Sequence, residues 1–253
     1  MASQSFQLEK WYLDVVADDG RTLVAYWLEL RWRALSVRAA STLVAGATGA
    51  TRERTTLLAR APPRVDDGAV RFACGRLDLE GRWSPIAPAA GATLLDGPTG
   101  HVTWECVAPA ARVSASVGGE TFEGLGYAER LTMTVPPWRL PIRELRWGRF
   151  AAAEGGLVWI EWRGDAPRAL ALRDGRPVPL AALREDRVCA GGVELTLADA
   201  VPLRAGSLGR GPLRRLAGAL PAALLRVDER KWRARGSAGG ARGWVIHEVV
   251  RWS

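Results

Sequence analysis

Tyr127 and Glu129, two residues apart near the middle of the chain, are the side chains best suited to acid–base chemistry. They follow Gly124 and Gly126, where the backbone can take unusual angles or approach a neighbour closely. Residues two apart on a strand share one face, so phenol and carboxylate should point together, into a cavity or into water. A carboxylic acid kept protonated by burial can protonate carbon, as hydration or cyclisation of an alkene requires. We therefore assign Glu129 as a candidate general acid and Tyr127 as the group that orients it.

Such chemistry passes through a cation, which aromatic faces stabilise, and the sequence contains 12 tryptophans. Tryptophan on a strand is nevertheless more often a core residue than a ligand contact. The Tyr127–Glu129 pair also has a plain alternative, in which it faces solvent and pairs with neighbouring arginines at little gain in stability. The predicted ligand-binding residues are Asp14, Trp147, Trp159, Glu161 and Trp162.

Other arrangements with catalytic potential are absent from the sequence. His247 and Glu248 are adjacent on a predicted strand and so point to opposite faces, which excludes a dyad. The 3 cysteines and 2 histidines lack the spacing of a zinc site, and we interpret the cysteines as free buried thiols in a reducing compartment. There is no glycine-rich phosphate loop and no serine-centred nucleophile elbow. We therefore expect no metal and no cofactor.

Composition indicates an ordinary globular protein. Its 253 residues are 48% hydrophobic and 25% charged, which permits one large all-β unit or two domains. No run approaches the roughly 18–20 apolar residues of a membrane span. The first ten residues have no basic end followed by an apolar block, so they do not resemble a secretory signal, and we expect a cytoplasmic protein.

The formal net charge of +8 raises the question of nucleic-acid binding. Lys10 and Lys231 are the only lysines, and the arginines are scattered singly, apart from a denser group over residues 204–215. A phosphate-tracking surface needs its positive charge gathered on one face. The pattern therefore argues against a nucleic-acid partner.

Short segments of alternating or β-branched character, separated by Gly-, Pro- and Asp-rich turns, predict an all-β barrel or sandwich. Asp19-Gly20 and Asp174-Gly175 are strong hairpin signals. The exception is Leu208–Leu225, whose leucines recur at helical spacing and predict a short amphipathic helix interrupted near Pro221. The predicted strands include Trp11–Val16, Thr22–Arg33, Ser36–Val44, Arg52–Ala59, Ala69–Leu79, Val102–Val107, Ala111–Val117 and Trp244–Trp252.

Three segments together resemble a known superfamily: Gly126-Tyr-Ala-Glu129, Trp147-Gly148 and Val158-Trp-Ile-Glu-Trp162. They are similar to the lipocalin-like superfamily of carotenoid 1,2-hydratases (hydroxyneurosporene synthases), AttH-like proteins and tocopherol cyclases. The opening Lys10–Asp14 and the closing Trp244–Trp252 also fit. In that superfamily the Trp-Gly pair follows the acid almost directly, whereas residues 130–146 intervene here. The resemblance implies two lipocalin-like antiparallel β-barrels packed side by side and an apolar ligand, often an isoprenoid.

We accordingly expect two domains, residues 1–120 and 121–253. Lys10-Trp11 and Lys231-Trp232 each open a hairpin, so the two ends of the chain echo one another through duplication or by chance. The leading functional hypothesis is a protein that binds a hydrophobic small molecule in a Trp-lined barrel pocket, as a cofactor-independent hydratase, cyclase or isomerase using Glu129. The alternatives are a non-catalytic lipid or isoprenoid carrier, and a structural or interaction protein whose barrels are filled.

Overall fold

β-Strands make up nearly all the regular structure in the computed structural model, which describes residues 6–210, 218 and 220–252. The chain divides into two compact units, Met1–Leu140 and Pro141–Ser253. Every strand pairing between the named strands is antiparallel, and the predicted all-β fold class is confirmed. Two short helices are described, the 3-10 helix η1 (Pro137–Arg139) and the α-helix α1 (Ala222–Leu225).

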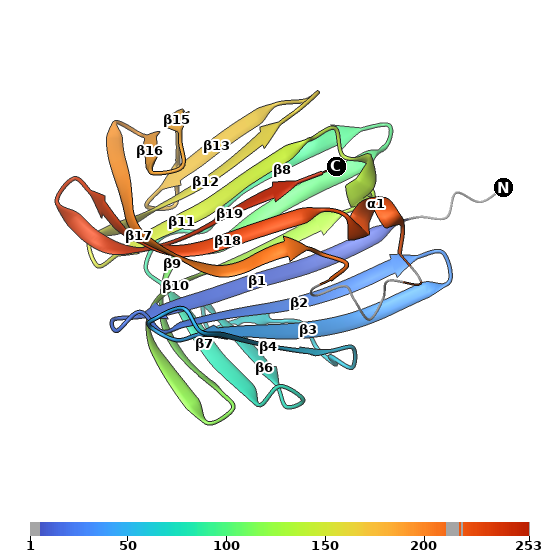
Figure 1. The fold of residues 1–253 in the computed structure, drawn as a ribbon, viewed down its shortest axis with the longest axis horizontal. Coiled ribbons are helices and arrows are strands. Elements are labelled where there is room, and N and C mark those ends of the chain that lie inside the picture. Colours follow the sequence, from blue (N-terminus) through green and yellow to red (C-terminus); the bar gives the residue numbers. More distant parts are fainter. Residues whose placement is uncertain (1–5, 211–217, 219, 253) are drawn as a thin grey trace. The chain divides into compact units, whose positions relative to one another are not determined.

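The first unit is a single sheet in the order β4-β3-β2-β1-β10-β9-β7-β6-β5, with β8 pairing β9 at one side (Figure 1). Its first strand therefore pairs with its last, which joins the two halves of the sheet. The strands are β1 (Gln7–Ala17), β2 (Thr22–Trp32), β3 (Leu35–Ala45), β4 (Thr51–Thr56), β5 (Arg64–Asp66), β6 (Ala69–Cys74), β7 (Leu79–Pro85), β8 (Ala90–Gly97), β9 (Gly100–Val117) and β10 (Glu120–Met133).

The second unit repeats this plan in the order β14-β13-β12-β11-β19-β18-β17-β16-β15. Its end strands β14 and β15 are consecutive in the chain, separated only by Pro179, and β15 also approaches β13. The sheet therefore curls back on itself as a barrel. The strands are β11 (Glu144–Ala152), β12 (Gly155–Arg163), β13 (Arg168–Arg173), β14 (Arg176–Val178), β15 (Leu180–Leu183), β16 (Arg187–Ala190), β17 (Val193–Ser207), β18 (Asp228–Ala238) and β19 (Ala241–Arg251).

The division between the units differs from the predicted one. It falls after Leu140 rather than after residue 120, because β10 pairs with β1 and β9 and so belongs to the first sheet. Tyr127 and Glu129 are therefore part of the first unit. The segment 130–146, which separates the acid from Trp147-Gly148, contains the end of β10, η1 and the start of β11, so it connects the two units.

The shared strand order supports a repeated architecture, but the lysine–tryptophan pairs do not mark it. Lys10-Trp11 lies on β1, the first strand of its unit, whereas Lys231-Trp232 lies on β18, the last but one of its own. The topological counterpart of β1 is β11, which carries Trp147-Gly148. Lys10-Trp11 and Lys231-Trp232 therefore do not occupy equivalent positions in the two units.

The local turn predictions largely hold. Asp174 and Gly175 both have positive φ, 52° and 75°, as a two-residue hairpin turn between β13 and β14 requires. Of the predicted helix at Leu208–Leu225, residues 211–217 and 219 lie outside the described residues, and α1 begins directly after Pro221. Proline suits that place because it lacks the N–H that a helix start leaves unpaired.

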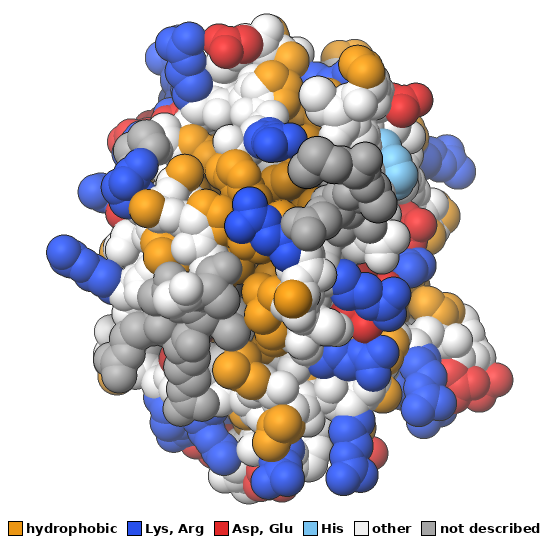
Figure 2. Space-filling view, turned by 90° about the vertical axis from the view of Figure 1, so that its right-hand side faces the viewer, with side chains coloured by type: hydrophobic (Ala, Val, Ile, Leu, Met, Phe, Trp, Pro, Cys, Tyr) orange, Lys and Arg blue, Asp and Glu red, His pale blue; other side chains and the backbone are white. Residues whose placement is uncertain are grey.

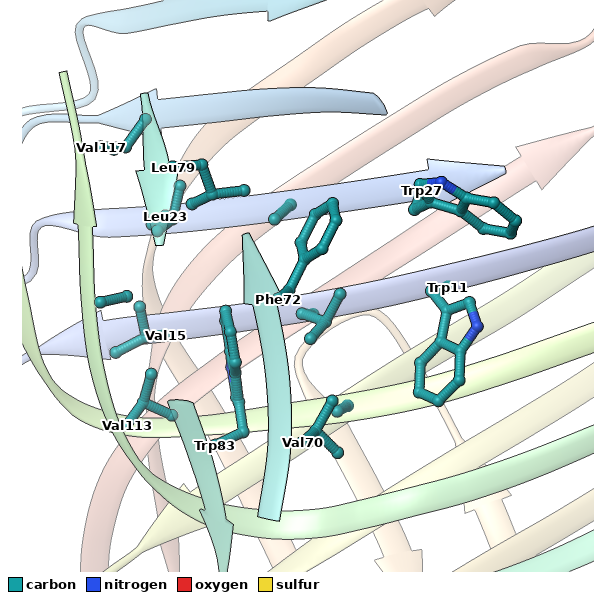
Figure 3. Packing of buried hydrophobic residues seen from close by; sticks show 14 of the residues in the cluster. Trp11, Val15, Leu23, Trp27, Val70, Phe72, Leu79, Trp83, Val113 and Val117 are labelled. Atoms are coloured by element: carbon teal, nitrogen blue, oxygen red, sulfur yellow. The ribbon is translucent and has the colours of Figure 1, made fainter. Parts of the chain in front are cut away.

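The core of the first unit follows from strand alternation. Trp11, Leu13 and Val15 of β1 point to one face, where they meet Phe72 and Trp83 of β6 and β7 (Figure 3). We call this the interior face of the sheet and the opposite side its outer face. The same terms apply to the second unit, whose interior face carries the cluster Phe150, Ala152, Leu157, Trp159, Ala171, Val188, Ala190, Leu195, Ala234 and Val245.

Charge is spread over the surface rather than concentrated. In Figure 2 the Lys and Arg side chains are distributed across the visible face. Several exposed arginines pair with a carboxylate, for example Arg21 with Asp19 at 2.7 Å. Among the described residues, no helix is both long and apolar enough to cross a membrane. The three cysteines are free; two are buried, whereas Cys189 is partly exposed.

Gly126 allows the closing pair of strands, β1 and β10, to approach. The indole Nε1 of Trp83 donates a 2.8 Å hydrogen bond to the backbone oxygen of Asp14, which turns that carbonyl towards the interior. A Cβ atom on Gly126 would lie 2.0 Å from the same oxygen. Only glycine fits there without moving the β1 backbone.

We expect Gly126→Ala to destabilise the protein by about 1–3 kcal/mol, as overpacking of a filled site does. Gly97→Ala is the matched control, because a Cβ at Gly97 meets nothing within 4 Å. Denaturant unfolding of the two variants and the wild type measures the difference. Equal midpoints for the two variants would show that the Asp14 carbonyl moves aside at no cost.

Candidate functional site

The carboxylate of Glu129 accepts two hydrogen bonds at one oxygen. The hydroxyl of Tyr127 donates to Oε2 at 2.7 Å, and the indole Nε1 of Trp104 donates to the same atom at 2.6 Å. Tyr127 and Glu129 therefore lie on one face of the strand and are joined by a hydrogen bond. Two donors on one oxygen fix the position of the group.

Trp104 comes close to Glu129 because β9 contains two successive bulges. Gly126 pairs with Ala111, Ala128 with Ala108, and Glu129 with Cys106, so β9 has one extra residue at each step. Each bulge shifts the register by one residue, and two together restore the alternation of faces. Cys106 consequently stands opposite Glu129 on the same face.

Pro109 lies at the first bulge, where it has no partner on β10. The other side of β9 changes partner here, from β7 to β8. The sequence prediction of two strands, Val102–Val107 and Ala111–Val117, is wrong because β9 continues through the proline. Proline within a sheet is tolerated at a bulge, where its missing N–H breaks no ladder hydrogen bond.

Asp14 joins this cluster from the neighbouring strand. It stands opposite Tyr127, and Tyr12 stands opposite Glu129, in the register of β1 and β10. Tyr12 packs between Tyr127, at 6.0 Å between ring centroids, and Tyr26, at 5.3 Å. Asp14, predicted from the sequence as a ligand-binding residue, therefore shares one face with Tyr12, Tyr127 and Glu129.

All these side chains lie on the outer face of the first unit, opposite the core that contains Leu13 and Ala128. They are nevertheless withdrawn from water, since Asp14 and Tyr127 are both 0% exposed. The Tyr127–Glu129 pair therefore points neither to the interior face of its own sheet nor to open solvent. We call Asp14, Cys106, Tyr127 and Glu129, with Trp104, the outer-face cluster.

Burial keeps the neutral members of this cluster protonated. Desolvation, with the neighbouring Cys106 and Glu129, raises the pKa of Tyr127 well above its usual range. Desolvation also raises the pKa of the Cys106 thiol, and the charge of Glu129 adds to the effect. Tyr127 is therefore a hydrogen-bond donor at neutral pH, and Cys106 is not a reactive thiolate.

A separate cavity of about 410 Å³ opens within the second unit. Register arranges the interior-face residues in and around the cavity in layers across β12, β11, β19 and β18. The aromatic layer consists of Trp159, Gly148, His247 and Trp232, and the next layer towards the strand ends consists of Glu161, Arg146, Val249 and Arg230. Below the aromatic layer lie Leu157, Phe150, Val245 and Ala234, all four of which belong to the interior cluster.

Gly148 makes room for the aromatic layer. A Cβ atom on Gly148 would lie 2.2 Å from Cζ2 of Trp159, so the indole lies directly over the glycine. On the other side of the layer the ring of His247 stacks on Trp232, with centroids 4.9 Å apart and planes at 21°. The Trp-Gly pair singled out in the sequence thus shapes this cavity through its glycine.

His247 is neutral in this environment. Burial, together with the positive charge of Arg146, lowers its pKa to about 4. Its Nε2 atom is buried and has no hydrogen-bond partner among the described residues. His247 and Glu248 point to opposite faces, as expected for neighbours on a strand, and Glu248 instead pairs with Lys231.

The predicted ligand-binding tryptophans fall in different places. Trp159 lines the cavity from the interior face. Trp147 borders the cavity, but the strand register places its side chain on the outer face, in one row with Glu248 and Lys231. The Nζ atom of Lys231 lies 5.6 Å from the centroid of the Trp147 ring. Trp162 alternates with Glu161 and also faces outward.

Glu161 shares the interior face with Arg146 and forms a 2.7 Å ion pair with Arg163. It does not border the 410 Å³ cavity. The structure thus divides the seven predicted site residues into two groups, with Asp14, Tyr127 and Glu129 in the first unit and the other four in the second.

Sequence reasoning missed Trp104, Cys106, Arg146, His247 and Trp232 as site residues. Trp104 and Cys106 reach Glu129 only through the two bulges of β9, for which Pro109 is the one visible signal. The others belong to the cavity through a cross-strand register that no single segment contains.

We expect the depressed pKa of His247 to make folding sensitive to acid. Above pH 6.5 the imidazole is neutral in both states; below it the unfolded chain binds a proton that the folded protein excludes until about pH 4. Stability is therefore lost as the pH falls through this range, by up to about 3 kcal/mol. His247→Phe should remove that part of the pH dependence, measured as unfolding free energy between pH 7 and pH 4. The exposed His101, changed to Phe, serves as control, and equal pH profiles for the two variants would contradict the assignment.

The sequence has no match among protein-family models and no significant match among curated proteins. Solved structures do share its fold. A protein described as a putative AttH from Nitrosomonas europaea is 13% identical, with a TM-score of 0.63 over 96% of this chain and 92% of its own. CghA, solved with Sch210972, is 11% identical, with a TM-score of 0.62 over 98% and 89%. Kievitone hydratase from Nectria haematococca is 10% identical, with a TM-score of 0.55 over 98% of this chain and 89% of its own. The chain therefore has the fold of these proteins along nearly its whole length.

Proposed function

We propose that this protein binds an apolar small molecule and acts on it by proton transfer through Glu129, as a cofactor-independent hydratase, cyclase or isomerase. The observation that carries the proposal is the pair of hydrogen bonds from Tyr127 and Trp104 to one oxygen of Glu129. A carboxylate held by two neutral donors within a buried aromatic setting is a positioned acid–base group rather than a solvated surface charge.

Each residue has a defined role in this mechanism. Tyr127 and Trp104 fix the carboxylate and disperse its charge in the ionised state. In a hydration, the Glu129 carboxyl group donates its proton to one alkene carbon, water adds to the other carbon, and the carboxylate takes up the proton that the water releases. In an isomerisation, the Glu129 carboxyl group donates its proton to one alkene carbon, and the resulting carboxylate then removes a different proton from a carbon next to the cation. Neighbouring aromatic faces stabilise the positive charge between these steps.

The fold comparison supports a hydratase-type activity. One protein of the same fold is a kievitone hydratase, and another was solved with the compound Sch210972. At 10–13% identity these likenesses concern fold, so residue roles are argued from this chain alone.

A carrier is the second candidate. The two hydrogen bonds at Glu129 hold its carboxylate in place, as they would also do in a purely structural group. The cavity of about 410 Å³ in the second unit exceeds the roughly 300 Å³ at which small-molecule pockets begin, which argues against a filled barrel in that unit, although its lining does not include Glu129. A carrier would release its ligand unchanged.

We expect Glu129→Gln to lower turnover by at least about 100-fold, the usual contribution of general acid–base catalysis, while keeping the shape of the side chain. Apolar compounds extracted from the denatured protein, and a panel of acyclic isoprenoid alkenes, are incubated with enzyme in ¹⁸O-labelled water. Mass spectrometry detects hydration through the added label, and chromatography detects isomers.

Glu123→Gln is the matched control, since Glu123 lies on the same strand and its carboxylate contacts the exposed Ser114 at 2.8 Å. The control should retain full turnover. Equal turnover by wild type and Glu129→Gln would refute the catalytic role, and unaltered recovery of a stoichiometric bound compound would establish the carrier.

A further inference from the structure

We propose that the cavity inside the second unit is a binding site for a flat aromatic carboxylate, separate from the outer-face cluster of the first unit. The aromatic layer formed by Trp159, His247 and Trp232 would hold the ring, and Arg146 would pair with the carboxylate. This site goes beyond the proposed function, because Glu129 takes no part in it.

The size and depth of the cavity fit a small ring system. Its volume of about 410 Å³ lies within the range of roughly 300–1,000 Å³ typical of ligand pockets. Apolar side chains contribute to its lining, among them Leu183, Val188, Leu197 and Val249. A bicyclic aromatic molecule would bury its faces against these groups and against the aromatic layer.

The aromatic layer offers a flat surface with an unused polar atom. The ring of His247 is already stacked on Trp232, with centroids 4.9 Å apart. On the other side of His247 in the register, the indole of Trp159 covers Gly148. Nε2 of His247 has no hydrogen-bond partner among the described residues. Burying a polar atom without a partner costs stability, which a ligand that reorients the ring would recover.

Arg146 and Arg230 both belong to the layer next to the aromatic one, and Arg146 is the shielded cation of the two, since the Arg230 side chain is 54% exposed. Arg146 precedes Gly148 by two residues on the same interior face, lines the cavity, and its side chain is 15% exposed. Its Nε donates to Glu144 at 2.7 Å, so the terminal N–H groups remain available to form the paired hydrogen bonds that carboxylates accept.

Arg146 belongs to an ion-pair network with surplus positive charge. Glu144 is shared by Arg146 at 2.7 Å, Arg251 at 2.8 Å and Arg163 at 3.3 Å, and Arg163 also pairs with Glu161 at 2.7 Å. Three guanidinium groups against two carboxylates leave one positive charge, which an anionic ligand would balance.

The rim of the cavity also carries acidic groups. Glu185, Asp186 and Asp199 line it, as do Arg184 and Arg230, and all five are exposed. Exposed charges are screened by water and salt, so they weigh less than the shielded Arg146. They would disfavour an anion that stays at the rim and leave the inner position as the favourable one.

The test uses the full-length protein and two probes of the same shape, 2-naphthoate and the uncharged 2-naphthylmethanol, titrated by calorimetry. We expect naphthoate to bind more tightly than the alcohol. Arg146→Gln should weaken naphthoate about tenfold, the effect of losing one charge-assisted hydrogen bond, and leave the alcohol unchanged. Trp232→Leu should weaken both probes.

Arg143→Gln is the matched control, because Arg143 is exposed, pairs with Asp165 and lies outside the cavity lining. It should bind both probes like the wild type. Circular dichroism and thermal unfolding establish that each variant is folded, and Arg146→Lys, which keeps the charge, should restore part of the naphthoate affinity.

The outcomes separate this proposal from the proposed function. Glu129→Gln should bind naphthoate normally even where turnover is lost, and loss of turnover alone leaves the cavity proposal standing. Absence of naphthoate binding, equal affinity for the two probes, or equal effects of Arg146→Gln and Arg143→Gln would overturn it.

Discussion

The pairing of the first strand of each unit with the last is the interaction on which the rest of this structure depends. In the first unit the β1–β10 ladder sets Asp14 opposite Tyr127, and in the second the β11–β19 ladder sets Gly148 opposite His247. Both ladders join residues far apart in the sequence, and both need a glycine at close contact. The Cβ of a residue replacing Gly126 or Gly243 would lie 2.0 Å from a backbone oxygen of the first strand. The ladder that joins the first and last strands of each unit therefore also brings together Asp14 and Tyr127 in the first unit, and Gly148 and His247 in the second.

Alternation along these strands divides each sheet into two faces with different uses. In the first unit the interior face carries a tryptophan- and valine-rich core, while the outer face carries the hydrogen-bonded carboxylate. In the second unit the interior face itself becomes polar beyond the aromatic layer, where Arg146 stands two residues before Gly148. One strand order therefore supports two chemically different sites, and the difference lies in which face receives the ionisable residues.

Much of the fold could be predicted from the sequence because its signals are local. Alternating strands, Asp174-Gly175 and the shared face of Tyr127 and Glu129 need only neighbouring residues. The boundary at residue 140 could not be predicted in this way, since β10 belongs to the first unit through pairing with β1, over 100 residues earlier. The contact of Trp104 with Glu129 could not be predicted either, because it depends on two bulges that shift the pairing of β9 with β10 by two residues.

That displacement has a bearing on how homologous chains could vary in length. Four β9 residues, 107–110, stand between the pairs Gly126–Ala111 and Glu129–Cys106, against only two residues on β10. Losing one of the four would remove one bulge, and losing two would leave a regular ladder, with Cys106 still opposite Glu129 in both cases. A third loss would leave β9 one residue short, so that every earlier β9 residue would shift by one place and exchange core for surface.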